Sequence, residues 1–405
     1  MAQQAEAGVT VAGKMKFILL AALCLLNGFV SVLNVHAEDA DSSNKRLHAR
    51  QLEAISDIVE KAVRGGKTPG AVVLIGNQGE VIYRRAFGFR SLEPEKIPMT
   101  EDTIFDLASL TKAIATTTAI MQLAEKGKLD IEAPVVHYWP AFKKNGKKNI
   151  TVRQLLTHYS GLRPDLSLNP GWSGYKNAMK KIVAERPLLP PDTGFIYSDI
   201  NFEVLGELVR RVSGLRLDRY CAEHIFRPLR MKDTGFTPAL SLRNRIAPTE
   251  YRNMKLLCGE AHDPSCHTMG GVAGHAGLFS TVDDLSVFSL MLLNGGSYRG
   301  RQILSPKTVE RMTASQSPPD KKNRGLGWDL EAPLVSNREE LCPAGAYGHL
   351  GYTGTALWVD PITDTYIIVL TNRVHPDGKG DVKALRAEIK KVVADALGPV
   401  SAEQV

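Results

Sequence analysis

In the stretch TIFDLASLTKAIATTTAIMQLA, residues 103–124, a lysine lies inside a helical segment that is otherwise uncharged. From Leu110 to Ala124, Lys112 is the only charge, and its neighbours are mainly Ala, Ile, Thr, Met and Leu. Apolar residues on nearly every face are typical of a helix that is buried on all sides. A buried ammonium group must find a partner or lose its proton. The stretch therefore predicts a chemical role for Lys112.

Ser109 stands three residues before Lys112, which places both side chains on one helix face, a turn apart. A serine hydroxyl needs a base to become a nucleophile, and a lysine stripped of water has a lowered pKa and can be that base. We therefore expect Ser109 to be the nucleophile and Lys112 to be partly neutral. Two other Ser-x-x-Lys pairs, Ser42–Lys45 and Ser173–Lys176, lie in polar or Gly/Pro-rich segments that do not desolvate a lysine.

Two further segments carry candidate site residues. In FIYSDINF (195–202), Tyr197 is a phenol among apolar residues, and a nearby ammonium would favour its phenolate, which could help to move the serine proton. In YGHLGYTGTALWVD (347–360), the glycines allow a strand edge to approach a substrate and to contribute to an oxyanion hole. Taken alone, each segment also fits a core tyrosine or an ordinary strand entry.

In this order, the three segments resemble the motifs of the serine β-lactamase and penicillin-binding-protein superfamily, in particular its class C branch and the related esterases. Three more segments are similar to bacterial serine hydrolases of that branch. They are ITVRQLLTHYSGL (150–162), FRPLRMKDTGF (226–236) and GGVAGHAGLFSTVDDL (270–285). The resemblance extends from about residue 50 to residue 395.

The resemblance implies roles for individual residues. Ser109 would be the acylated nucleophile, with Lys112 and Tyr197 as the general acid/base pair. The backbone amides of Ser109 and Tyr352 would form the oxyanion hole. Substrate would be bound by Asp199, His349 and Gly351.

Three positions depart from the family pattern. Where Lys-Thr-Gly is common, this chain has His349-Leu350-Gly351, so a largely neutral imidazole replaces a cation and a hydroxyl is lost. Where Tyr-x-Asn is usual, Asp199 replaces an amide donor by an acceptor. Contacts that normally hold a substrate carboxylate are therefore missing, and we expect ester hydrolysis to exceed β-lactam hydrolysis.

The fold expected from these patterns is α/β (α+β), with an antiparallel sheet flanked by helices and an inserted, mostly helical lobe. One serine hydrolase domain would span residues 47–400. Its α/β lobe would come from about 47–100 and 290–400, and its helical lobe from about 101–289. A hairpin is expected around Asn77-Gln78-Gly79, a strand pair in 355–372 with a turn at Pro361–Asp364, and a closing helix in 381–397.

The N-terminus reads as a secretory signal. Lys14 and Lys16 precede the apolar run FILLAALCLLNGFVSVLNV, which ends at Val35-His36-Ala37. We expect cleavage after Ala37, a polar linker in 38–46, and a periplasmic or secreted protein, with an uncleaved membrane anchor as the alternative.

The net charge and the cysteine content limit the classes of partner that we expect. A formal net charge of +7 over 405 residues, with scattered basic clusters, does not indicate nucleic-acid binding, although it allows association with the cell envelope. Cys258 and Cys266 are close enough to form a disulfide, and free thiols are the other reading. With His262, Asp263 and His267 they mimic a metal cluster, but the spacing fits no structural zinc pattern. We expect neither a metal nor a cofactor.

The sequence thus predicts an exported serine hydrolase that forms a covalent acyl-enzyme with a small ester or a peptidoglycan-type peptide. The alternative is a catalytically idle member of the same fold that binds peptidoglycan or serves as a scaffold. The chain contains no G-x-S-x-G nucleophile elbow and no H-E-x-x-H zinc motif, which argues against an α/β-hydrolase and a metalloprotease.

Overall fold

The computed structural model describes residues 50–169, 171–330 and 346–397. The expected signal segment, 1–37, and the expected linker, 38–46, lie outside these residues. The chain divides into a unit Met1–Glu53 and a unit Ala54–Val405, and the fold described below is that of the second unit. Within the described ranges, no helix is long and apolar enough to span a membrane.

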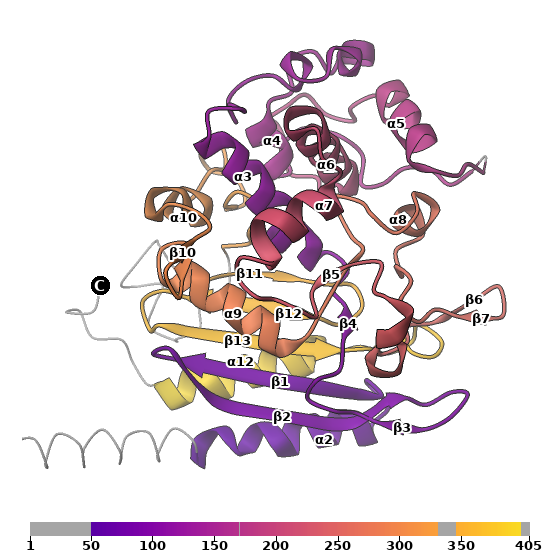
Figure 1. Cartoon of the computed structure of the whole chain (residues 1–405), viewed down its shortest axis with the longest axis vertical. Helices are drawn as coiled ribbons and strands as arrows, with labels where there is room; N and C mark the ends of the chain where they lie inside the picture. Colours follow the sequence, from indigo (N-terminus) through magenta and orange to yellow (C-terminus); the bar gives the residue numbers. More distant parts are fainter. Residues whose placement is uncertain (1–49, 170, 331–345, 398–405) are drawn as a thin grey trace, which may run out of the picture. The chain divides into compact units, whose positions relative to one another are not determined.

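A six-stranded antiparallel sheet forms the base of this unit (Figure 1). Its order is β11-β12-β13-β1-β2-β3, so that the N-terminal strand β1 pairs along its length with the C-terminal strand β13. The sheet is therefore built from both ends of the chain, which confirms the expected fold class. The strands are β1 (Gly70–Asn77), β2 (Glu80–Ser91), β3 (Ile97–Pro98), β11 (Tyr347–Leu350), β12 (Ala356–Asp360) and β13 (Thr365–Thr371).

Two of the sheet's turns lie where the sequence places them. Gln78 and Gly79 join β1 to β2 with φ angles of 51° and 80°, a pair of left-handed residues that suits a tight hairpin. Residues 361–364 join β12 to β13, and Asp364 also has a positive φ of 48°. The hairpin and the C-terminal strand pair are confirmed.

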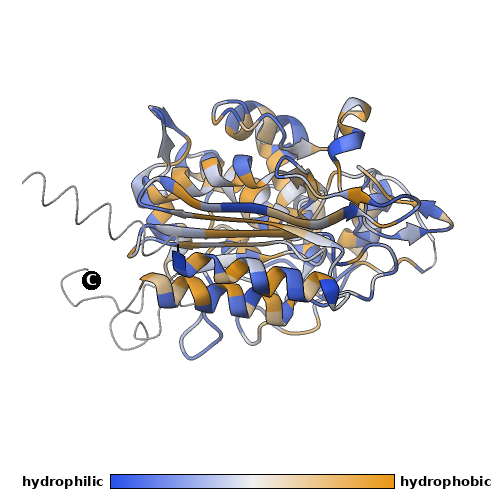
Figure 2. Cartoon of the chain, turned by 90° about the horizontal axis from the view of Figure 1, so that it is seen from below, coloured by the Kyte–Doolittle hydropathy of each residue, from blue (hydrophilic) through white to orange (hydrophobic). Residues whose placement is uncertain are grey.

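Helices cover both faces of the sheet. Figure 1 shows α2 (Ala54–Arg64) and α12 (Lys383–Leu397) on one face and α9 (Val282–Leu293) on the other. α2 buries Ile55 and Val59, and its four charged residues are exposed, as expected of a helix with one packed face. Figure 2 shows hydrophilic and hydrophobic residues mixed along the helices that flank the sheet.

The remaining helices come from the segment between β3 and β11, and most of them lie on the side of α9 that faces away from the sheet (Figure 1). The α-helices are α3 (Thr118–Glu125), α4 (Val152–Leu156), α5 (Tyr175–Ala184), α6 (Asp199–Ser213), α7 (Leu217–Cys221), α8 (Pro264–Thr268) and α10 (Pro306–Thr313). The π-helices are η1 (Lys112–Thr117) and η4 (Ala222–Phe226), and the 3₁₀ helices are η2 (Val135–His137), η3 (Pro140–Gly146) and η5 (Leu240–Arg245).

Short strands within this segment were not anticipated from the sequence. β4 (Phe105–Asp106), β8 (Leu278–Ser280) and β5 (Gly235–Phe236) form a small antiparallel sheet, and β4 ends three residues before Ser109. Strands of two or three residues are too short to leave a periodic pattern in the sequence. Two further pairs are β6 (Tyr251–Arg252) with β7 (Lys255–Leu256), and β9 (Ser297–Tyr298) with β10 (Arg301–Gln302).

The helix after Ser109 is buried throughout, as its composition predicts. Every residue of η1 is buried, and α3 continues it with buried residues through Leu123. A π-helical segment is rare and is often found at functional sites. The buried charge of Lys112 lies at the first residue of this segment.

Candidate active site

Ser109 lies in a tight turn between β4 and the helix. Oδ1 of the buried Asp106 accepts a hydrogen bond from the Ala108 amide at 2.8 Å, and Oδ2 accepts one from the His262 amide at 2.7 Å. Ala108 has a φ of +46°, an uncommon conformation for a residue other than glycine. Asp106 therefore supports a strained turn that precedes the serine, a role that no sequence motif indicated.

Lys112 is fully buried, and its ammonium group has three acceptors. Nζ lies 2.9 Å from Ser109 Oγ, 3.0 Å from the His275 carbonyl oxygen and 2.7 Å from Asp199 Oδ1. An ammonium group has three N–H donors and no acceptor. Lys112 therefore donates hydrogen bonds to the Ser109 hydroxyl and to the His275 carbonyl, and it forms an ion pair with Asp199.

The expectation that Lys112 is partly neutral is wrong. Burial disfavours the charged form, but Asp199 and Tyr197 outweigh burial and raise the pKa of Lys112 above its usual range. The apolar neighbours of the lysine along the helix indicate burial alone. The carboxylate that opposes the effect of burial comes from α6, nearly ninety residues later in the chain.

The start of α6 brings Tyr197 and Asp199 to Lys112. Oγ of Ser198 accepts a hydrogen bond from the Asn201 amide and caps the helix, so that Tyr197 precedes the cap and Asp199 opens the first turn. The ring centroid of Tyr197 lies 5.0 Å from Lys112 Nζ. Asp199 forms an ion pair with Lys112, and the contact with substrate expected of Asp199 stays a prediction.

His158 supports this arrangement from behind. Its Nδ1 accepts a hydrogen bond from the Ser198 amide at 3.0 Å, and its ring stacks on Tyr197 with a centroid distance of 4.4 Å. Burial, with the positive charge of Arg324, lowers the pKa of His158 well below its ordinary value. His158 therefore has a structural role, as a buried neutral imidazole that holds Tyr197 in place.

The turn after β11 is tied to the serine turn. Thr353 Oγ1 donates to the Asp106 carbonyl at 2.7 Å, and Thr355 Oγ1 donates to the Leu107 carbonyl at 3.0 Å. A Cβ on Gly351 would meet Thr355 Oγ1 at 2.0 Å and the Leu107 oxygen at 2.5 Å, so this approach requires glycine.

The main-chain amides of Ser109 and Tyr352 are available as donors. Within the described chain, neither amide is engaged in a hydrogen bond. Both residues line the same cleft. An oxyanion hole formed by these two amides stays a prediction, which their availability on one cleft supports.

His349 lies on β11 and is buried, with an exposed fraction of 4%. Because the Leu350 carbonyl can only accept, the contact of 2.9 Å to His349 Nδ1 places a proton on that nitrogen. Burial, Arg324 and Lys112 hold the pKa of His349 well below its ordinary value. The expectation of a neutral group at this position agrees with this environment.

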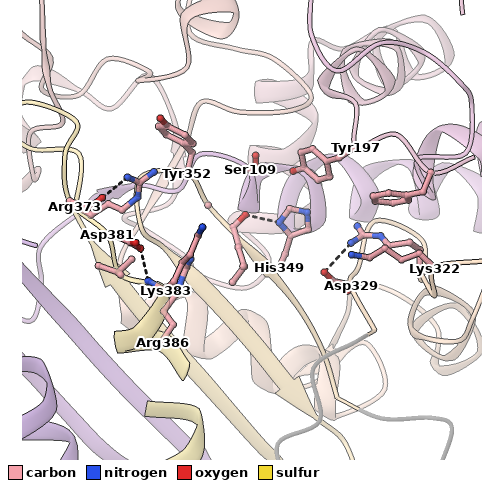
Figure 3. A pocket seen from close by; sticks show the side chains of 16 residues that line it. Ser109, Tyr197, Lys322, Asp329, His349, Tyr352, Arg373, Asp381, Lys383 and Arg386 are labelled. Atoms are coloured by element: carbon pink, nitrogen blue, oxygen red, sulfur yellow. Dashed lines mark hydrogen bonds and ion pairs between the residues drawn. The ribbon is translucent and has the colours of Figure 1, made fainter. Parts of the chain in front are cut away.

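A cleft of about 720 Å³ opens over Ser109. Figure 3 shows Tyr197 beside Ser109, with Lys322 and Asp329 on the side of Tyr197, and Arg373, Lys383 and Arg386 on the side of Tyr352. The lining includes five cationic side chains but only two carboxylates. The cations are Lys322, Arg324, Arg373, Lys383 and Arg386, and the carboxylates are Asp329 and Asp381.

The cations near Tyr352 come from β13's C-terminal loop and the first turn of α12. Arg373 Nη1 donates to the Gly380 carbonyl at 2.8 Å, and its guanidinium lies 4.5 Å from the centre of the Tyr352 ring. In the part of the chain that the structure describes, no carboxylate lies within ion-pair distance of Arg373, Lys383 or Arg386. Burial and the charge of Arg373 lower the pKa of Arg386. The members of this cluster share no motif, so the sequence gives no sign of it.

An acidic network lies behind Lys112. His275 Nε2 is 2.8 Å from Asp263 Oδ1, and His275 Nδ1 is 3.6 Å from Glu203 Oε1. Burial disfavours the charged imidazole, but Asp263 and Asp199 outweigh it and raise the pKa of His275 to about 9. Burial raises the pKa of Glu203 to about 8.

Ligand atoms of Asp199, Asp263 and His275 lie within 4.8 Å of one another, as in a candidate metal site. The pairs that Asp199 forms with Lys112 and Asp263 forms with His275 already compensate their charges. Cys258 and Cys266 are free thiols in this structure, and Cys342 lies outside the described residues.

Together, a serine hydrogen-bonded to a buried lysine, a tyrosine beside both, and two available amides define a serine hydrolase that works by acyl transfer. The Beta-lactamase family profile matches residues 55–390. The chain belongs to this family and is a serine hydrolase of the β-lactamase fold.

Individual relatives agree with this assignment. The chain is 32% identical over 382 residues to the N-acetylmuramyl-L-alanine amidase of Bacillus subtilis (strain 168), and the match covers 84% of each chain. It is 33% identical over 344 residues to an Escherichia coli (strain K12) protein provisionally named D-alanyl-D-alanine carboxypeptidase, which covers 76% of this chain and 79% of that protein.

Solved structures show the same fold. EstCE1, a hydrolase with promiscuous acyltransferase activity, aligns with a TM-score of 0.68 at 23% identity over 86% of this chain and 99% of that one. A family VIII carboxylesterase aligns with a TM-score of 0.68 at 22% identity, over 85% and 97% of the two chains.

Proposed function

We propose that the protein is an exported hydrolase that forms an acyl-enzyme at Ser109 with esters or peptidoglycan-type peptides. The observation that carries this proposal is the contact of 2.9 Å between Lys112 Nζ and Ser109 Oγ, beside Tyr197. Export and a periplasmic or secreted location rest on the signal-like residues 1–37 and on nothing in the fold.

In the proposed mechanism, Tyr197 is the base and Lys112 is a fixed cation. Asp199 keeps Lys112 an ammonium group, which cannot accept a further proton, so in this proposal the Ser109 proton passes to the phenolate oxygen of Tyr197. The Ser109 oxygen then attacks the acyl carbon, and the Ser109 and Tyr352 amides bind the oxyanion. Tyr197 returns its proton to the leaving group, and it next activates the water that hydrolyses the acyl-enzyme.

The proposed substrates carry an anionic group near the scissile bond. The strand residues His349 and Leu350 lack the contacts that hold a carboxylate in the family pattern. Arg373, Lys383 and Arg386 offer a replacement on the opposite side of the same cleft, where Asp381 is the nearby carboxylate but forms no ion pair with them in the described chain. Charge complementarity of this kind gives specificity for an anionic partner. A peptidoglycan-type peptide with a free carboxylate fits this environment, and so does an acidic ester.

The test is hydrolysis of p-nitrophenyl butyrate and of nitrocefin by the purified chain and by Ser109→Ala. We expect ester turnover to exceed nitrocefin turnover, because the contacts that would hold the nitrocefin carboxylate are missing at His349 and Leu350 and the cations lie on the opposite side of the cleft. Ester turnover should be lost in the variant. The idle binding or scaffold protein would turn over neither substrate. Rapid nitrocefin hydrolysis would show that the substitutions at His349 and Leu350 do not restrict the site as argued.

A further inference from the structure

A second cavity, of about 700 Å³, lies among α5, α6, α7 and the loop that follows α8. This volume is within the range of small-molecule sites, about 300–1,000 Å³. The residues that form its floor are apolar and almost fully buried. They are Met179, Leu217, Met269, Val272 and Ala273.

The rim of this cavity is strongly basic. Five cationic side chains line it, namely Lys176, Lys180, Arg210, Arg211 and Arg216. Glu207 pairs with Arg210 and Arg211, and Asp218 pairs with Arg216. The exposed Lys176 and Lys180 of α5 have no carboxylate within ion-pair distance in the described part of the chain. The rim thus keeps two uncompensated positive charges on one helix.

The inner end of the cavity meets the acidic network behind Lys112. Glu203 lines the cavity with an exposed fraction of 1%, and neither of its carboxylate oxygens has a hydrogen-bond partner in the described chain. Burial raises its pKa to about 8, so it is mostly uncharged at pH 7 and does not repel an anion.

The cavity is also linked to the catalytic site through the backbone of Gly274 and His275. Gly274 lines the cavity, and its carbonyl accepts a hydrogen bond of 2.6 Å from Thr116 Oγ1. The next residue, His275, holds Lys112 through its carbonyl oxygen. A ligand in the cavity therefore contacts the segment that positions the catalytic lysine.

We propose that this cavity binds an amphiphilic anion, with its alkyl chain on the apolar floor and its charged group at Lys176 and Lys180. An apolar floor under a cationic rim is complementary to this chemistry. The anionic group can be a carboxylate, as in a fatty acid, or a phosphate monoester. The site is separate from the cleft over Ser109, and the two cavities share no lining residue.

The test uses four probes of one chain length: decanoate, decyl phosphate, decanol and decyltrimethylammonium, titrated into the purified chain by isothermal calorimetry. We expect one of the two anions, or both, to bind, and the preferred anion identifies the source. Equal binding of decanol or decyltrimethylammonium would overturn the proposal, and so would the absence of binding by both anions.

Variants locate the binding. Lys176→Glu/Lys180→Glu should weaken anion binding about ten-fold or more, because charge-assisted contacts are lost. Lys143→Glu/Lys148→Glu makes the same charge change at exposed lysines outside the cavity and should leave binding unchanged. If binding is instead lost in Lys383→Ala/Arg386→Ala, the anion occupies the catalytic cleft and the proposal fails. These measurements do not depend on hydrolytic activity.

Discussion

The ammonium group of Lys112 lies 2.7 Å from a carboxylate oxygen of Asp199 and 2.9 Å from the hydroxyl of Ser109. A buried lysine is usually considered as a neutral base, but this pair keeps it charged. The lysine then serves to orient Ser109 and to stabilise negative charge on Tyr197. This relationship is the reason that we propose Tyr197, and not Lys112, as the acceptor of the serine proton.

Removing the carboxylate tests this relationship. In Asp199→Asn, the pKa of Lys112 should fall, because burial is no longer opposed by an anion. The ammonium form is then lost as pH rises through this lower pKa, so the alkaline limb of kcat/KM against pH should move to lower pH. Asp199→Glu, which keeps the charge, is the control. An unchanged limb in Asp199→Asn would contradict the assigned role.

Tyr197→Phe removes the proposed base and leaves the Lys112–Asp199 pair intact. We expect kcat for p-nitrophenyl butyrate to fall by about 10²–10⁴-fold, the usual contribution of general acid–base catalysis. The KM should change little, because the ring still lines the cleft. A variant with nearly the wild-type kcat would exclude Tyr197 as the base.

Gly351→Ala should separate the two turns that form the site. The added Cβ would meet the Leu107 carbonyl at 2.5 Å, which forces the Tyr352 amide away from Ser109. Loss of an oxyanion donor costs about 10²–10³-fold in kcat. Gly235→Ala is the matched control, because nothing lies within 4 Å of its added Cβ. Equal activities of the two variants would argue against an oxyanion role for this turn.

Substrate charge can be tested with Lys383→Ala/Arg386→Ala. For an ester that carries a carboxylate near the scissile bond, KM should rise by about ten-fold or more, since hydrogen bonds to charged groups are lost. A neutral ester should be unaffected. Lys391→Ala, on the same helix but outside the cleft, is the control for α12. Equal effects on the neutral and the anionic ester would rule out recognition of the anionic group.

The network behind Lys112 predicts a pH dependence of stability. The folded-state pKa of His275, about 9, exceeds its unfolded value near 6.5, so its contribution is fully present below pH 6.5 and is lost as pH rises through about 9. Thermal unfolding of His275→Gln should therefore depend less on pH in this window than that of the wild type. His137→Gln, at an exposed histidine, should keep the wild-type dependence. Parallel curves for His275→Gln and the wild type would contradict the assignment.

Local sequence patterns predict the parts of the fold that are determined by residues close together in the chain. The hairpin at Gln78-Gly79 and the strand pair around Pro361–Asp364 follow from turn chemistry and alternation. The antiparallel sheet follows from strands at both ends of the chain. The burial of the helix after Ser109 follows from its composition.

The charge of Lys112 could not be predicted in this way. It depends on Asp199, which belongs to another helix and carries no pattern that links it to the lysine. The cations of the cleft come from a loop and from α12, and only the fold brings them to Ser109. Asp106 belongs to a strand of two residues, which is too short to be predicted from the sequence, and the strained turn follows that strand.

The central claim is that Ser109 becomes covalently acylated. The direct measurement is the intact mass of the chain after reaction with a fluorophosphonate, followed by peptide mapping. We predict one adduct per chain on Ser109, no adduct in Ser109→Ala, and wild-type labelling in Ser173→Ala, whose serine belongs to another Ser-x-x-Lys pair. An adduct that persists in Ser109→Ala, or that maps to another residue, would contradict the account.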